Sequence, residues 1–254
     1  MQTPLVVGQA KSATQFIALA LAQSIGSQVR QISYMPVGGQ IIPPELWAIR
    51  GTDNVGRSHA PASRFNLGMI REAGFERFVL LVRDPRDALI SWWHHLDREL
   101  IKSNGWALAQ DVADGLRTAS YYSLSRDEQI DQLIRLTYPA FVRWIADWMN
   151  AIDSGLVSCL IVRYEDFCRD QRSHVSKMLR YFGSDAAPLL PERGEQKISD
   201  VTNQRRGVSG SHKDELTDDQ VARLDAVSPH GLFQRMGWQI GSPAIAESPA
   251  VAER

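Results

Sequence analysis

The stretch FVLLVRDPRDALIS at residues 78–91 decides the fold. Its first five residues are apolar without polar alternation, which is typical of a strand buried on both faces of a parallel sheet. Asp84 and Pro85 then predict a helix, because Asp is a good N-cap and Pro suits the first helical position. Arg83 falls at the carboxyl end of the strand, where open parallel sheets bind their ligands. The stretch therefore predicts a strand–helix unit with a cation at its ligand-binding edge.

Two further apolar runs, Leu5–Gly8 and Leu156–Val162, also read as buried strands. Helical patterns follow at Thr14–Gln23 and at Tyr138–Ile152, where Trp144 and Trp148 have the spacing of core residues. Strands that alternate with helices predict an α/β layer architecture. Three polar segments between them are predicted as loops: Met35–Arg57, Ser103–Arg126 and Pro188–Ser211. We expect residues 1–240 to form one domain and residues 241–254 to form a flexible tail.

The bulk composition is that of an ordinary globular protein of 254 residues with a formal net charge of −1. This charge gives no global attraction to nucleic acid or to an anionic membrane, so any anion site must be a local group of Lys and Arg. No run approaches the roughly 20 apolar residues that cross a bilayer, and no signal-peptide pattern is seen. Cys159 and Cys168 are expected to be reduced thiols. We expect a cytoplasmic enzyme or binding protein.

A strand–turn–helix motif spans GQAKSATQF, residues 8–16. The N-terminus of a helix offers unpaired N–H groups and partial positive charge, which favours phosphate. Lys11 adds a full charge, and Ser12 and Thr14 add hydroxyl groups. The Walker pattern is missing, so the stretch alone is equally consistent with an ordinary buried turn.

Three other groups of residues suggest chemistry. Arg83 and Ser91 could grip a phosphate, although an Arg–Asp surface pair is the simpler interpretation of Arg83 and Asp84. His59, in the segment RSHAP at residues 57–61, has the ordinary pKa of a general base, but a lone His is more often a surface or core residue. The basic segment at residues 205–207 could clamp a phosphate or be a solvated loop.

Together and in this order, these segments resemble the PAPS-dependent sulfotransferase family, from Val6 to about Trp238. The family's Pro-Lys-Ser-Gly-Thr-Thr-Trp-like loop is matched by residues 10–16, and its Lys-Thr-His-Xaa-Pro segment by residues 57–61. Its Arg…Ser motif is matched by Arg83 and Ser91, Tyr-Glu-Asp by residues 164–166, and the late Arg-Lys-Gly by residues 205–207. The resemblance implies a P-loop-NTPase-like, three-layer α/β/α fold with a central parallel sheet.

The resemblance also implies roles for residues of this chain. His59 would take the acceptor's proton, Lys11 would neutralise the leaving group, and Arg57 would assist at the sulfuryl oxygens. The implied positions for 3′-phosphoadenosine 5′-phosphosulfate (PAPS) are Lys11, Ser12, Ala13, Thr14 and Gln15 at the 5′ end, Phe16 and Tyr164 at adenine, and Arg83, Ser91, Arg205, Arg206 and Gly207 at the 3′-phosphate. The chain departs from the family at several positions. Ala13 replaces Gly and is expected to disfavour left-handed dihedrals, Phe16 replaces Trp, and Arg57 replaces Lys.

The implied activity is transfer of the sulfuryl group from PAPS to a hydroxyl or amine of a small-molecule acceptor, leaving 3′-phosphoadenosine 5′-phosphate (PAP). A sulfuryl group carries less charge than a terminal phosphoryl group, so no metal is expected to be required. Tyr34, Trp47 and the segment around them are predicted to line the acceptor pocket. A homo-oligomer is possible, but the family's dimer motif is altered at Asp218 and Ala222. The alternatives are a P-loop-type kinase and an inactive adenine-nucleotide-binding protein.

Overall fold

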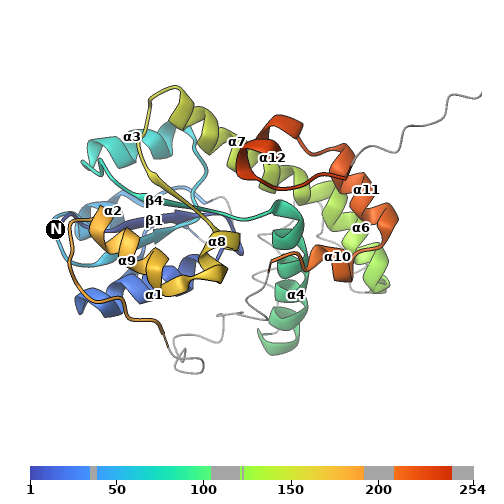
Figure 1. Ribbon diagram of the computed structural model, residues 1–254, viewed down its shortest axis with the longest axis horizontal. Helices are drawn as coiled ribbons and strands as arrows, with labels where there is room; N and C mark the ends of the chain where they lie inside the picture. The colour runs from blue at the N-terminus through green and yellow to red at the C-terminus, as the bar shows by residue number, and fades with distance from the viewer. Residues whose placement is uncertain (35–38, 104–120, 122, 192–208, 242–254) are drawn as a thin grey trace, which may run out of the picture.

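Five short strands form one parallel sheet in the computed structural model (Figure 1), which describes residues 1–34, 39–103, 121, 123–191 and 209–241. Across the sheet they lie in the order β2-β3-β1-β4-β5, and every neighbouring pair is parallel. Their carboxyl ends therefore meet at one edge of the sheet. The strands are β1 (Leu5–Gly8), β2 (Val29–Gln31), β3 (Val55–Ser58), β4 (Val79–Val82) and β5 (Leu160–Arg163).

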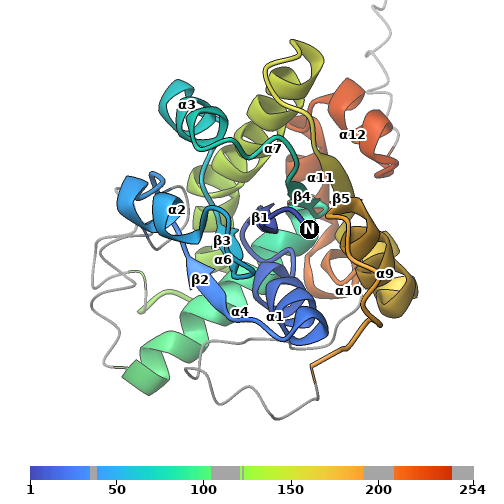
Figure 2. The ribbon, with the colours of Figure 1, turned by 90° about the vertical axis from the view of Figure 1, so that its left-hand side faces the viewer.

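Helices cover both faces of this sheet (Figures 1 and 2). On one face, α1 (Thr14–Ile25) and α9 (Gln171–Tyr181) bury their apolar side chains against alternate residues of the strands. On the other face the sheet packs into a larger core with α2 (Pro43–Ile49), α3 (Arg64–Glu72) and α7 (Tyr138–Asp153). The predicted three-layer α/β/α architecture is confirmed.

A second group of helices lies beyond the strand ends (Figure 1). Their apolar residues join the same core as α7, so they extend that layer. They are α4 (Pro85–Ser103), α6 (Arg126–Leu136), α10 (His212–Glu215), α11 (Asp218–Ala226) and α12 (His230–Met236); α8 (Tyr164–Arg169) follows β5 directly.

A buried ion pair fixes the start of α4. Asp84 caps this helix by accepting the N–H of Arg86 at 2.9 Å. The Arg86 guanidinium returns two bonds to the Asp84 carboxylate and reaches Asp225 of α11 at 2.7 Å. Asp84 thus pairs with Arg86 inside the protein, and the simpler interpretation of Arg83 and Asp84 as a surface pair is wrong.

The strands with apolar sequences were predicted well. Leu5–Gly8 matches β1, and the run ending at Val82 matches β4 to within one residue. The strand predicted at Leu156–Val162 begins only at Leu160. The reason is that the Leu156 N–H still bonds to the Ala151 carbonyl at the end of α7, and its side chain is 56% exposed.

The loop predicted at Met35–Arg57 is wrong, because it contains α2 and most of β3. Two prolines of this segment, Pro43 and Pro44, occupy the first turn of α2, where a missing N–H costs nothing. Residues 104–120, 122, 192–208 and 242–254 lie outside the described residues, and with them most of the other two loops and the tail. The division into one domain and a tail stays a prediction.

Two general features can be stated for the described residues alone. None of their helices is long and apolar enough to span a bilayer. Cys159 and Cys168 are both free thiols, as predicted, and both are partly buried.

Candidate active site

The loop between β1 and α1 is tightly folded. The N–H and the hydroxyl of Ser12 both donate to the Gln9 carbonyl, at 3.2 and 2.6 Å. Lys11 and Ala13 adopt left-handed dihedrals, with φ of 68° and 66°. Ala13 is therefore left-handed even though this conformation is unfavourable for alanine. Left-handed alanine is strained, and it persists only where the surrounding turn dictates it.

The N-terminus of α1 is open. Its N-cap, Ala13, has no side chain that could bond the first N–H groups, and the first turn holds no acidic residue. Thr14 Oγ1 lies 3.2 Å from Ser12 Oγ, and since Ser12 gives its only proton to Gln9, Thr14 must be the donor between them. Both hydroxyl protons are thus engaged, and the backbone N–H groups are the donors that an anion would meet.

Arg83 lies beside this loop. Its Nη1 donates to the Lys11 carbonyl at 2.9 Å, and its backbone N–H donates to Gln9 Oε1 at 2.9 Å. The guanidinium carbon is 4.1 Å from the centre of the Tyr164 ring, which begins α8. Three predicted residues from the ends of β1, β4 and β5 therefore meet at one edge, as the strand pattern predicts. Gln9, whose side chain links the end of β1 to the N–H of Arg83 after β4, was not predicted.

His59 follows β3 and is held against the end of β1. Its Nδ1 lies 2.6 Å from the Gly8 carbonyl. A carbonyl only accepts, so Nδ1 carries the proton and Nε2 keeps its lone pair. Burial lowers the pKa of His59 to about 4, and the charges of Arg57 and Lys11 lower it further against the raising effect of the Gly8 bond. The imidazole is therefore neutral at pH 7 and able to accept a proton at Nε2.

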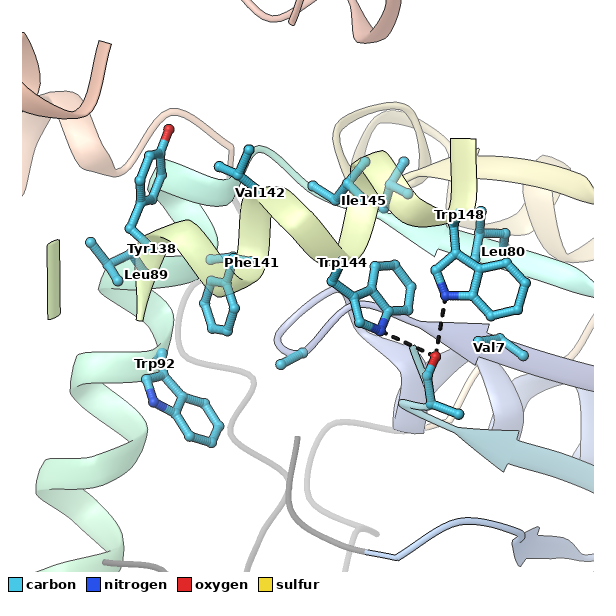
Figure 3. Close-up of a cluster of buried hydrophobic side chains, with 14 of the residues drawn as sticks. Val7, Leu80, Leu89, Trp92, Tyr138, Phe141, Val142, Trp144, Ile145 and Trp148 are labelled. Atoms are coloured by element: carbon cyan, nitrogen blue, oxygen red, sulfur yellow. Dashed lines mark hydrogen bonds between the residues drawn. The ribbon is translucent and has the colours of Figure 1, made fainter. Parts of the chain in front are cut away.

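Two tryptophans of α7 fix the backbone at His59, and Figure 3 shows both indoles with hydrogen bonds that they donate. Trp144 Nε1 donates to the carbonyls of His59 and Ala60, at 3.1 and 3.2 Å, and Trp148 Nε1 donates to that of Ala60 at 3.2 Å. Both indoles are buried, so their assignment to the core is confirmed. They also hold the segment that carries the imidazole, a role that helical spacing does not reveal.

Arg57, the last but one residue of β3, is held by two glutamines. Its Nε donates to Gln31 Oε1 at 2.8 Å, and its Nη1 donates to Gln15 Oε1. Burial lowers the pKa of Arg57. Arg57 is also close enough to His59 to influence the pKa of that group. The sequence predicted Arg57 and the backbone of Gln15, but it gave no sign of Gln31.

The other predicted positions have different outcomes. Phe16 is only 9% exposed and its ring packs edge-on against Phe167, so little of it is open to a base. Ser91 lies in α4, is partly exposed, and makes no side-chain hydrogen bond within the described residues. The positions predicted in the late basic segment lie outside the described residues: Arg205, Arg206 and Gly207.

Asp87 anchors the chain just after that segment. Its carboxylate accepts the N–H groups of Gly210 and His212, at 2.6 and 2.9 Å, and His212 Nδ1 at 2.7 Å. These bonds and the charge of Arg83 lower the pKa of Asp87 to about 2 against the raising effect of burial. Asp87 was not predicted as part of the site. Its burial between two segments 123 residues apart could not be read from the local sequence.

Comparisons with known proteins bear on the family and the fold of this chain. A family model for the sulfotransferase domain matches residues 57–237. The mouse sulfotransferase SULT7A1 complexed with PAP is similar in structure, with a TM-score of 0.59 and 14% identity over 92% of this chain and 84% of that chain. A sulfotransferase from Alicyclobacillus acidocaldarius has a TM-score of 0.49 and 17% identity, over 92% of this chain and 99% of its own. No curated protein sequence matches.

At these identities the structural likeness shows the fold alone. The family model, however, spans most of the chain and includes His59, Arg83 and Tyr164. The loop with Lys11 lies before the matched range, so its place in the site depends on the contact between the Lys11 carbonyl and Arg83. This chain belongs to the sulfotransferase family.

Proposed function

We propose that this chain transfers the sulfuryl group of PAPS to a hydroxyl or amine of a small-molecule acceptor. The observation that carries the proposal is the contact of Arg83 with the Lys11 carbonyl, beside a His59 whose Nε2 is unprotonated. It supports one crevice with cations for both ends of a bisphosphorylated nucleoside and a base between them.

In the proposed reaction His59 Nε2 takes the proton of the acceptor hydroxyl. The acceptor oxygen forms a bond to sulfur while the bond from sulfur to the 5′-phosphate oxygen breaks. Such transfers pass through a loose, in-line transition state, so catalysis depends on position and fixed positive charge. Lys11 would neutralise the departing bisphosphate and Arg57 the sulfuryl oxygens, and a positioned base contributes roughly 10²–10⁴ in rate.

Arg83 supports a site for the 3′-phosphate. A guanidinium stacked on Tyr164 is oriented, and a fork of N–H donors matches phosphate oxygens. The assignments of Ser91 and of the segment at residues 205–207 to this phosphate stay predictions. Phe16 and Tyr164 are both buried, at 9% and 8% exposure, so the assignment of these two rings to adenine stays a prediction.

A kinase of P-loop type is less well supported. Such an enzyme needs a carboxylate for Mg²⁺ beside the phosphate loop. The two carboxylates that follow β4 are both engaged, Asp84 with Arg86 and Asp87 with His212. Within the described ranges no three His, Cys, Asp or Glu side chains gather as metal ligands. An inactive nucleotide-binding protein would have no need for a base held in one tautomer.

The proposed acceptor is defined by its chemical class, a small molecule with a hydroxyl or an amine. Tyr34 and Trp47 are 62% and 44% exposed, which suits the predicted aromatic wall of an acceptor pocket. Thr217 of the altered dimer motif caps α11 by accepting the Gln220 N–H at 3.2 Å, so its local role needs no second subunit. A cytoplasmic location and a homo-oligomer stay predictions.

Binding and turnover test the proposal. PAP should bind far more tightly than ATP, and only PAPS should serve as donor for a panel of phenols, alcohols and amines. His59→Ala should reduce turnover by roughly 10²–10⁴ while PAP affinity is kept. Arg83→Ala should weaken PAP binding by about 10- to 100-fold, because a charge-assisted bond to phosphate is lost. A fully active His59→Ala variant would remove the base from the mechanism, and equal binding of ATP and PAP would contradict the proposal.

A further inference from the structure

One of the two glutamines that hold Arg57 is itself oriented by hydrogen bonds to Ser33. Gln31 Nε2 donates to the carbonyl and to the hydroxyl of Ser33, both at 3.0 Å. Because a carbonyl can only accept, the amide nitrogen must face Ser33 and the amide oxygen must face Arg57. Gln31 is the last residue of β2 and Gln15 lies in the first turn of α1. Acceptors from two elements therefore fix the guanidinium of Arg57 in β3.

Both acceptors are uncharged, and this separates Arg57 from the arginines that are paired with a carboxylate. No carboxylate contacts Arg57 within the described part of the chain. Its pKa is lowered by burial, whereas neighbouring carboxylates raise the pKa of the paired arginines. The arginines paired with a carboxylate include Arg86 with Asp84, Arg163 with Asp166, and Arg235 with Asp153.

A partly buried cation without a counter-ion is costly unless an anion binds to it. Amide dipoles can hold a guanidinium in one orientation and leave its full charge available. A carboxylate would hold it more firmly but would cancel much of that charge. Fixed charge of this kind stabilises a transition state because it needs no reorganisation.

We propose that Gln31, with Gln15, is a positioning residue that aims the Arg57 guanidinium at the transferring group while leaving its charge uncompensated. This inference rests on the proposed function. It concerns the choice of a neutral acceptor beside Arg57. It predicts that a carboxylate at position 31 lowers activity even though the carboxylate can still hold Arg57.

Two variants at position 31 separate the effect of losing the acceptor for Arg57 from the effect of placing a negative charge beside it. Gln31→Met keeps the length of the side chain but loses the acceptor and the donors to Ser33. Gln31→Glu loses the same donors, keeps an acceptor for Arg57 and adds a negative charge. A purely structural role predicts that Gln31→Glu is at least as active as Gln31→Met. Our inference predicts that kcat decreases from the wild type to Gln31→Met and further to Gln31→Glu. The kcat of Gln31→Glu should be about tenfold or more below that of the wild type.

The control is Gln28→Glu. Gln28 is exposed and lies just before β2, so this substitution adds the same charge at the opposite end of the strand. It should keep wild-type kcat and PAP affinity. PAP lacks the sulfuryl group, so PAP affinity of both Gln31 variants should stay within about threefold of wild type while kcat falls. Equal losses of kcat and PAP affinity, or wild-type kcat in either Gln31 variant, would overturn the inference.

Inorganic sulfate gives a readout that does not depend on turnover. It should raise the Tm of the wild-type protein, raise that of Gln31→Met less, and raise that of Gln31→Glu least, since a bound anion stabilises the folded state. If the wild type neither binds PAP nor transfers sulfuryl, the proposed function is wrong, and the sulfate series still decides the inference. An equal sulfate effect on all three proteins would then overturn it.

Discussion

Ala13→Gly should stabilise this protein, which is unusual for a glycine introduced next to a helix. Ala13 sits at φ 66° and ψ 24°, and a left-handed conformation costs an L-residue roughly 1–2 kcal/mol. Glycine adopts it freely but loses roughly 0.5–1 kcal/mol more backbone entropy on folding. Loss of the partly buried methyl group, which packs on the α1 core, subtracts a few tenths of a kcal/mol. The net change is about +0.5 kcal/mol in the free energy of unfolding.

The matched control is Ala222→Gly. Ala222 is exposed within α11, where right-handed dihedrals suit alanine, so glycine there should cost about 1 kcal/mol. The two variants should therefore differ by about 1.5 kcal/mol, or roughly 3–6 °C in Tm for a chain of this size. The measurement is thermal and urea unfolding of the three proteins side by side. If Ala13→Gly lowers Tm as much as Ala222→Gly does, the dihedrals of the loop between β1 and α1 have been read wrongly.

Three further predictions concern single side chains. Because His59 must be neutral to act as a base and its pKa is about 4, kcat/KM should fall only near that pH and not near 6.5. Below about pH 6.5 the unfolded chain takes up a proton at His59, whereas the folded chain does not. The free energy of unfolding should therefore fall by up to about 3 kcal/mol between pH 6.5 and 4, and His59→Gln should lack this pH dependence. In Gly8→Ala the new methyl group would collide with Thr14 Oγ1, and chemical unfolding should show a loss of about 1–3 kcal/mol; unchanged stability would contradict the packing of α1 on β1. Asp87→Asn breaks the buried pair with His212 and should lower the free energy of unfolding by roughly 3–5 kcal/mol at pH 7. In the wild type the contribution of Asp87 to stability should be lost only as the pH falls from about 4 to 2. A loss below 1 kcal/mol in Asp87→Asn would show that the pair contributes little.

The sequence predicted the fold wherever burial is uniform. β1 and β4 lie at the centre of the sheet, and their continuous apolar runs identify them. β2 and β3 escaped prediction because their sequences, VRQ and VGRS, are short and polar. Their pairing is fixed instead by neighbours in the sheet, as in the register of Gln31 with Arg57. Local pattern therefore found the core of the sheet and missed the strands beside it.

The same limit applies to the site. Lys11, His59 and Arg83 were predicted because each sits at a strand end in a recognisable motif. Trp144 and Gln9 were not, since each acts on a site residue far along the chain: Trp144 on the carbonyl of His59, 85 residues away, and Gln9 on the N–H of Arg83, 74 residues away. Residues that carry chemistry leave a local signal, whereas residues that position them are defined only by the folded structure.

The distribution of charge explains how a chain with a net charge of −1 can build an anion site. Several cations elsewhere in the described residues are matched by carboxylates, as Arg86 is by Asp84 and Arg235 is by Asp153. For two of the cations at the strand ends, hydrogen bonds go to uncharged oxygens: the Lys11 carbonyl for Arg83 and two amides for Arg57. At Arg57 an anion therefore meets a charge that is already oriented and that no carboxylate contacts among the described residues, and no global positive field is needed to attract it. Moving a single carboxylate into this edge should consequently harm function more than a change of the same size in net charge elsewhere.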